Sequence, residues 1–250
     1  MAHQEIIRIV PGSRYAVLML HGILGTPDHF RELLPLVPES WSVHALLLDG
    51  HGGAVEDFSH TSMKKWKAQV FSRLEELLQT HEQVFIAAHS MGTLFAIQAS
   101  LRYPGRIPAL FLLGSPLRVF VQPKSALDSV KMSVFGHVDP RDQSAVDMRL
   151  GCSVEADWRV WKYPFWIPRF LELFREIWHT RKLLGQIRVP TQVFQSKKDE
   201  LVHPSSFDDF VGYPTITVTM LPDSGHFGYG PRDMALLQEK FREMLADLSS

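Results

Sequence analysis

Six short runs rich in strand-forming residues recur along the chain, several of them continuously apolar, and helical patterns separate most of them. A continuously apolar run of this length is typical of a strand that is buried on both faces of a sheet. Strands that alternate with helices predict a mostly parallel, doubly wound sheet with helices on both faces. We therefore expect an α/β fold with a helical insertion. The predicted strands are Tyr15–Leu20, Ser42–Asp49, Gln83–Ala88, Ile107–Gly114, Thr191–Ser196 and Thr215–Leu221.

Three helices are predicted between and after these strands. Apolar residues recur three and four positions apart between Thr61 and Thr80, and again from about Pro231 to Leu248. This spacing places them on one face of a helix. A third helix is expected over Met91–Arg102, and Thr26 followed by proline is a typical helix start.

One long segment interrupts the alternation. No strand is predicted from Ser115 to about Gly185, and this segment carries four of the six tryptophans. We interpret residues 115–185 as a helical cap over the C-terminal edge of the sheet, where α/β proteins bind ligands. Residues 1–114 and 186–250 then form the core. Most of the aromatic residues should form the insertion's own core, and a minority should line a substrate pocket. The pocket candidates are Trp158, Trp161, Phe165 and Trp166, with His21 in a Gly-rich loop.

Ser90 lies between a predicted strand and a predicted helix, which is the setting of a nucleophile elbow. The elbow pattern is G-x-S-x-G, because the turn is strained and the helix packs close to the strand. Gly92 occupies the second glycine position of this pattern, and Ala88 occupies the first, where glycine is usual. Because such a string also arises by chance, these residues alone favour a nucleophile only slightly over an ordinary turn.

A serine hydroxyl needs a base to become a nucleophile. Of the 12 histidines, His226 is the best placed, because its loop follows the last predicted strand and faces the same sheet edge as Ser90. His89 adjoins the serine, but neighbours on a tight turn usually point apart. The other histidines near strand ends are His21, His51 and His203.

The base in turn needs a carboxylate that orients it. Asp199 follows the strand Thr191–Ser196, and the order Ser90, Asp199, His226 is the order expected for this architecture. Glu200 and Asp223 are weaker candidates for the acid. Asp223 is only three residues before the histidine, so a productive pairing of their side chains is awkward.

Two backbone N–H groups are candidates to bind an oxyanion. Met91 follows the serine at a helix N-terminus, and Ile23 lies in the loop after the first strand. An ordinary turn is the simpler interpretation of that loop. Its occurrence together with a serine, an acid and a histidine, each at a strand end, argues against this simpler view.

Composition excludes several other functions. The formal net charge is −1, without a basic block or acidic tail, which argues against nucleic acid or an anionic membrane as a partner. Cys152 is the only cysteine, so no intramolecular disulfide forms, and we expect it to be an inert packing residue. No signal peptide is visible, and no apolar run reaches the ~20 residues needed to cross a bilayer. We expect a cytoplasmic protein with a small-molecule substrate.

Five motifs occur in the order found in the α/β-hydrolase superfamily, which this sequence resembles over nearly its whole length. They are LHGILGT, LLLDGHGG, AHSMGTLFA, SKKDELV and DSGHF. The stretches HGILGTPDHFRELLPLV and HSMG look most like small carboxylesterases and monoacylglycerol lipases. The resemblance implies an α/β-hydrolase fold with a helical cap, a Ser90–Asp199–His226 triad, and no metal or organic cofactor. The departures are Ala88, and Lys197-Lys198 in place of a glycine before the acid.

The resemblance implies hydrolysis of carboxylic esters through an acyl-enzyme on Ser90. The aromatic insertion favours an apolar substrate, such as a short-to-medium acyl ester or a monoacylglycerol. Relatives use the same triad on thioesters, lactones and C–C bonds or for acyl transfer, and the sequence does not separate these reactions. A ligand-binding receptor on a hydrolase scaffold is an alternative of another class. Nothing in the sequence predicts the oligomeric state.

Overall fold

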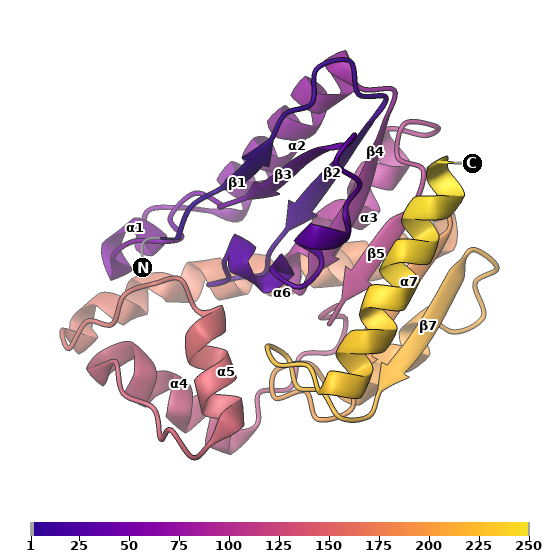
Figure 1. Ribbon diagram of the computed structural model, residues 1–250. Coiled ribbons are helices and arrows are strands. Elements are labelled where there is room, and N and C mark those ends of the chain that lie inside the picture. The colour runs from indigo at the N-terminus through magenta and orange to yellow at the C-terminus, as the bar shows by residue number, and fades with distance from the viewer. Residues whose placement is uncertain (1–2, 250) are drawn as a thin grey trace.

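The computed structural model describes residues 3–249, and these residues form a seven-stranded sheet with helices on both faces (Figure 1). All neighbouring strands are parallel except β1 and β3, so the predicted mostly parallel, doubly wound sheet is confirmed. The strand order is β1-β3-β2-β4-β5-β6-β7. The strands are β1 Ile6–Arg8, β2 Tyr15–Leu20, β3 Ser42–Leu46, β4 Gln83–His89, β5 Leu110–Leu113, β6 Thr191–Ser196 and β7 Ile216–Leu221.

The two faces of the sheet bury two separate hydrophobic clusters. Along β2, Leu18 and Leu20 belong to one cluster, whereas Val17 and Met19 belong to the other. Successive side chains of a strand point to opposite faces, so both faces need apolar residues. This burial on two sides explains why strands such as β2 and β5 are continuously apolar rather than alternating.

Helices cover the two clusters unequally. Trp66 of α2, Leu94 of α3 and Ile177 of α6 pack in the first cluster, and Leu237 and Phe241 of α7 pack in the second. In Figure 1, α7 accordingly lies in front of the sheet, and α2 and α3 lie behind it. These helices are α2 Met63–Thr80, α3 Met91–Arg102, α6 Ile167–Arg181 and α7 Pro231–Ser249. Shorter elements are α1 Val55–Ser59, η1 Pro27–Phe30, η2 Leu34–Leu36 and η5 Pro204–Phe210.

Two features near the N-terminus differ from expectation. The strand β1 was not predicted, because three residues at a sheet edge are too few to form a recognisable pattern. Thr26 caps a helical turn by accepting the N–H of Asp28, but this turn is the short 3₁₀ element η1 rather than a longer helix.

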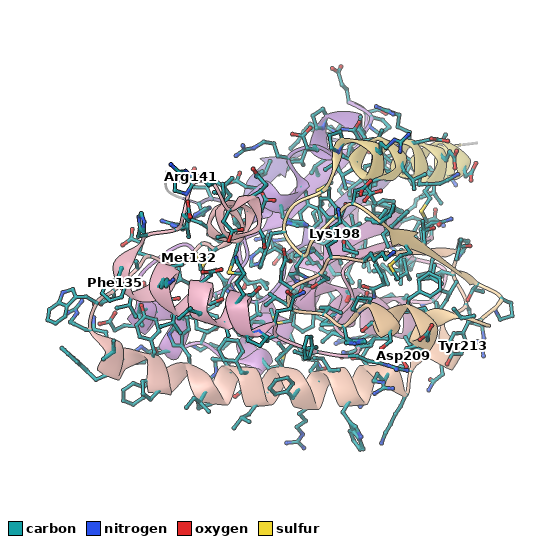
Figure 2. All side chains as sticks on the ribbon, turned by 90° about the horizontal axis from the view of Figure 1, so that it is seen from below. Met132, Phe135, Arg141, Lys198, Asp209 and Tyr213 are labelled. Atoms are coloured by element: carbon teal, nitrogen blue, oxygen red, sulfur yellow. The ribbon has the colours of Figure 1, made fainter. Side chains whose placement is uncertain are left out.

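The chain between β5 and β6, which we call the β5–β6 segment (residues 114–190), is mainly helical. Its elements are α4 Pro123–Phe135, α5 Gln143–Gly151, η3 Val160–Trp166, α6 and η4 Leu184–Gln186. α4 and α5 lie beyond the ends of the strands to which the arrowheads point (Figure 1). α6 packs against α3 and α2, and Figure 2 shows it along one side of the molecule, from near Phe135 to near Asp209. Within residues 3–249, no helix is both long and apolar enough to cross a membrane.

Candidate active site

Ser90 occupies a sharp turn between β4 and α3. Its φ is 52° and its ψ is −124°, a left-handed conformation that is rare for a residue with a side chain. Such strain costs roughly 1–3 kcal/mol and is concentrated at functional sites. A Cβ at Gly92 would lie 2.2 Å from the carbonyl oxygen of Leu20, so only glycine permits α3 to start this close to β2.

Ala88, the residue that departs from the usual elbow pattern, fits without disturbing the strand. It pairs in regular parallel register with Leu20 of β2 and Leu112 of β5. Its methyl group is fully buried in the first hydrophobic cluster. The extra methyl is therefore part of the core and does not obstruct the turn at Ser90.

The structure brings Ser90, His226 and Asp199 into one buried chain of hydrogen bonds. The Nε2 of His226 is 3.0 Å from the Ser90 Oγ, and its Nδ1 is 2.8 Å from the Asp199 Oδ2. An ionised carboxylate only accepts hydrogen bonds, so Nδ1 carries the proton. Nε2 is then free to accept the serine hydroxyl.

The surroundings of the three carboxylates near His226 distinguish them. Asp199 is buried, and its Oδ1 accepts the N–H groups of Leu201 and Val202 at 2.9 and 2.7 Å. Asp223 is half exposed and pairs instead with Lys198. Glu200 contacts the backbone of His226 rather than its ring. Only Asp199 is therefore placed to orient the imidazole.

Opposing effects set the protonation of His226. Burial lowers the pKa of His226, but the charge and hydrogen bond of Asp199, with the charge of Glu200, outweigh it and raise that pKa above 6.5. An imidazole with a raised pKa binds a proton more strongly.

Two further histidines, which the sequence did not single out as partners, lie near His226: His89 contacts its ring, and His29 stacks on His89. The His89 Nε2 donates to the His226 carbonyl oxygen at 3.0 Å. The His29 ring stacks on that of His89, with centroids 3.6 Å apart. Burial and then the charge of His226 lower the pKa of His29 to about 3, and burial and neighbouring histidines lower that of His89 well below 6.5. The position of His89 next to Ser90 could have identified it from the sequence. No sequence feature identifies His29.

His21 and His51 brace the loop that contains Ile23. The Nε2 of His21 accepts the N–H of Leu48, and its Nδ1 donates to the carbonyl oxygen of Gly22 at 2.8 Å. The Nε2 of His51 accepts the N–H of Leu24. Burial, the first cause in each case, lowers the pKa of both, that of His51 to about 4. Both rings are neutral and hold the loop backbone.

Ser90 lines a narrow cavity of about 20 Å³. This volume has room for one or two water molecules. Ile23, Leu201 and Phe227 give it an apolar part. Its other lining residues are Gly22, Gly25, Thr26, His29, His89, Gly151 and His226.

The predicted pocket residues do not line this cavity. His21 is buried beneath the loop, and Trp166 packs against Phe58 while its Nε1 donates to Val55. The other three predicted pocket residues lie on the surface of the β5–β6 segment, namely Trp158 at 68%, Trp161 at 59% and Phe165 at 66% exposure. The lining residues Gly151, Leu201 and Phe227 come from three separate segments, which no local pattern brings together.

A second cavity, of about 930 Å³, adjoins the narrow one and shares His29, Gly151 and Phe227 with it. Charged side chains of η1, α5 and the chain after α5 contribute to its wall, including Asp28, Asp147 and Glu155. A drug-sized ligand would fit this volume.

The two candidate oxyanion donors lie beside Ser90. Ile23 lines the narrow cavity with Ser90, and no described residue accepts a hydrogen bond from its N–H. The neighbouring N–H groups of Leu24 and Gly25 are already bonded. Met91 is the first residue of α3, so its N–H has no acceptor one turn earlier in the helix. In the described part of the chain, no group of three His, Cys, Asp or Glu side chains could hold a metal ion.

Comparison with known proteins finds relatives over almost the whole chain. Residues 11–213 match a hydrolase family described as serine aminopeptidase, S33. A thermostable monoacylglycerol lipase from Bacillus sp. (strain H-257) is 25% identical over 237 residues, which are 92% of this chain and 90% of the lipase. The predicted resemblance to α/β hydrolases of the esterase and lipase type is confirmed.

Solved structures share the fold. One, from a study of the metagenome-derived lipolytic enzymes LipS and LipT, has a TM-score of 0.73 and 17% identity, and the match covers 98% of both chains. The monoacylglycerol lipase of Paleococcus ferrophilus has a TM-score of 0.67 and 18% identity, over 98% of this chain and 99% of that one.

Proposed function

Because the chain belongs to the hydrolase family described as serine aminopeptidase, S33, we propose that it is a serine hydrolase that cleaves carboxylic esters. One observation carries this proposal: the buried hydrogen-bond chain from Ser90 through His226 to Asp199, which begins on a strained turn. A hydroxyl beside a neutral imidazole, which a carboxylate orients in turn, is the arrangement that activates a serine.

In the first half of the reaction, the Ser90 Oγ attacks the ester carbonyl carbon, and the Nε2 of His226 takes its proton. The carbonyl electron pair moves onto oxygen, and the N–H groups of Ile23 and Met91 bind the resulting oxyanion. Loss of one such donor typically lowers turnover by about 10²–10³. His226 then protonates the leaving alcohol, the C–O bond breaks, and an acyl group remains on Ser90.

The second half repeats these steps with water. His226 removes a proton from the water, whose oxygen attacks the acyl carbon, and the same two amides bind the new oxyanion. Its collapse returns the proton to the Ser90 Oγ and releases the acid. Asp199 keeps the Nδ1 proton in place and stabilises the imidazolium, without itself becoming protonated.

We propose that residues 115–185 form a cap and that the substrate is a short-to-medium acyl ester or a monoacylglycerol. Support for the cap is that α4 and α5 lie beyond the carboxyl edge of the sheet and that Gly151 of α5 lines the narrow cavity. Support for the substrate is the apolar lining by Ile23, Leu201 and Phe227, the polar wall of the wider cavity, and the monoacylglycerol lipases among the relatives.

Labelling with a fluorophosphonate probe tests the nucleophile. We expect the folded protein to be labelled at Ser90, and the variant Ser90→Ala to be neither labelled nor active. A folded wild-type protein that resists the probe would contradict the enzyme proposal and favour the receptor alternative.

A substrate panel tests the reaction. We expect turnover of p-nitrophenyl esters that varies with acyl length, and release of fatty acid from monoacylglycerol. Acyl thioesters, lactones and amino-acid p-nitroanilides belong in the same panel, because the triad alone does not separate these reactions. Equal rates at all acyl lengths would contradict the apolar pocket, and turnover of the anilides alone would contradict esters as the substrate class.

A further inference from the structure

The side chain of Glu200 joins the loop of His226 to the β5–β6 segment. One carboxylate oxygen, Oε2, accepts the backbone N–H of His226 at 2.7 Å. The other, Oε1, accepts the hydroxyl of Ser144 on α5 at 2.5 Å. Hydrogen bonds to an ionised acceptor are stronger than neutral ones, so this bridge is a firm connection.

Glycines allow α5 to lie directly on the His226 loop. A Cβ at Gly225 would lie 2.6 Å from the Oε1 of Glu200, so a side chain there would displace the bridge. A Cβ at Gly151, the last residue of α5, would lie 2.4 Å from the Cδ1 of Phe227. The helix α5 therefore contacts the loop at Phe227, and the Glu200 carboxylate packs against the loop at Gly225.

The backbone of Glu200 is held by the beginning of the same segment. The N–H of Gln122 donates to the carbonyl oxygen of Glu200, and the N–H of Phe120 donates to that of Leu201, both at 2.9 Å. Val119 and Val202 form an antiparallel bridge next to them. Glu200 is thus fixed at its backbone, while its carboxylate contacts the loop of His226 and the helix α5.

From these contacts we propose that Glu200 is a positioning residue, which holds the backbone of His226 and couples its place to that of α5. The proposal rests on the proposed function, since it assumes that His226 is the base. Glu200 does not line the narrow cavity and acts through His226. A shift of about 1 Å in a catalytic group can cost about 10²-fold in rate, so a bridge of this kind influences turnover more than substrate binding.

The charge of Glu200 gives the proposal a second consequence. The groups that face His226 are Asp199 and Glu200 after β6, Ser90 and His89 at the end of β4, and His29 of η1. Burial keeps the two neighbouring histidines neutral, so the negative charges near the imidazole are those of Asp199 and Glu200. Neutralising Glu200 should therefore lower the pKa of His226.

Three variants separate the positioning of His226 by Glu200 from the effect of the Glu200 charge on the pKa of His226. The readouts are kcat, KM and the pH profile. Glu200→Gln keeps an acceptor for the His226 N–H but removes the charge, so the acid limb of the kcat/KM profile should move to lower pH. Glu200→Ala removes the bridge, and kcat should fall about 10- to 100-fold with a much smaller change in KM. Ser144→Ala leaves the charge, so kcat should fall without a shift of the acid limb.

A double-mutant cycle tests the coupling to α5. Ser144→Ala should have little further effect in a Glu200→Ala background, because the bridge is already lost. Two matched controls should behave as wild type in the pH profile. Glu172→Gln alters a carboxylate that accepts the N–H of Met63, and Ser129→Ala removes a hydroxyl that bonds only within the β5–β6 segment.

NMR titration of the His226 imidazole keeps this proposal distinguishable from the proposed function. If wild-type Ser90 resists fluorophosphonate but Glu200→Gln lowers the His226 pKa and the controls do not, the enzyme proposal fails while the electrostatic contact stands. If wild type is an active esterase but neither kcat nor the acid limb responds to Glu200→Gln and Glu200→Ala, the positioning role is refuted. A fall in kcat that the controls reproduce would also refute it.

Discussion

At the scale of single residues, the proposed chemistry depends on which carboxylate reaches His226. Asp199 accepts from the Nδ1 of His226 and from two backbone N–H groups, so it is held in one orientation. Asp223 is paired with Lys198 at the surface. The proton on Nδ1, which leaves Nε2 as the acceptor, thus follows from a single side chain.

Replacing this acid should abolish most activity. We expect Asp199→Asn to lower kcat by about 10³–10⁴, because an amide can donate to Nδ1 and favour the wrong imidazole tautomer. The measurement is steady-state hydrolysis of a p-nitrophenyl ester at pH 8, with Asp223→Asn as the control that should retain near wild-type activity. The reverse result would assign the acid to Asp223.

The pH dependence of activity follows from the raised pKa of His226. The proposed base accepts the serine proton only when it is neutral, so we expect activity to be lost as pH falls through its pKa. Burial opposes the charged form, but Asp199 and Glu200 raise the pKa above 6.5. We therefore expect kcat/KM to have an acid limb with an apparent pKa above 6.5, and fluorophosphonate labelling of Ser90 to follow the same curve. A limb near 3 or 4 would point to His29 or His51 instead.

At the scale of elements, η3 contains both a buried and an exposed tryptophan. Trp166 packs between Phe58 and Tyr163 and donates its Nε1 hydrogen to the carbonyl oxygen of Val55 on α1. Trp161 lies on the surface, near Trp158. Trp161 and Trp166 are only five residues apart, yet the first is exposed and the second is buried in the core.

Truncation of the two side chains should separate these roles. Trp166→Ala should lower the free energy of unfolding by about 3–5 kcal/mol, as loss of a large buried aromatic side chain does. Trp161→Ala should change it by less than about 0.5 kcal/mol. Urea unfolding followed by circular dichroism measures both, and equal effects would contradict the burial described above.

At the scale of the whole molecule, the β5–β6 segment shares its core with the sheet. Trp166, Leu173 and Ile177 of this segment belong to the same hydrophobic cluster as Leu18 of β2 and Leu94 of α3. α6 packs directly against α2 and α3. A segment that completes the core on one face of the sheet should not unfold on its own.

We therefore expect a single cooperative unfolding transition. Tryptophan fluorescence reports chiefly on the β5–β6 segment, which holds four of the six tryptophans, whereas far-ultraviolet circular dichroism reports on the whole chain. The two midpoints in urea should coincide, as two-state unfolding requires. An earlier fluorescence transition would mean that the segment opens independently of the sheet.

The sequence by itself predicted the sheet, most of its strands, and the serine, histidine and acid at its carboxyl edge. These follow from local patterns, since a strand buried on both faces is continuously apolar and the residues just after it reach one edge. Ala88, which departs from the usual elbow pattern, is no barrier in the structure, because its methyl group lies in the core. The strand β1 was not predicted, because a three-residue edge strand has no periodicity to detect.

Only the tertiary structure decided how the loops meet. It paired Asp199 with the ring of His226, stacked His29 on His89 beside His226, and placed Glu200 between His226 and α5. It also left Trp158 on the surface, away from the narrow cavity. The physical reason is the same in each case: loop conformation and the rotation of a helix about its axis depend on packing between segments distant in sequence, which no local pattern records.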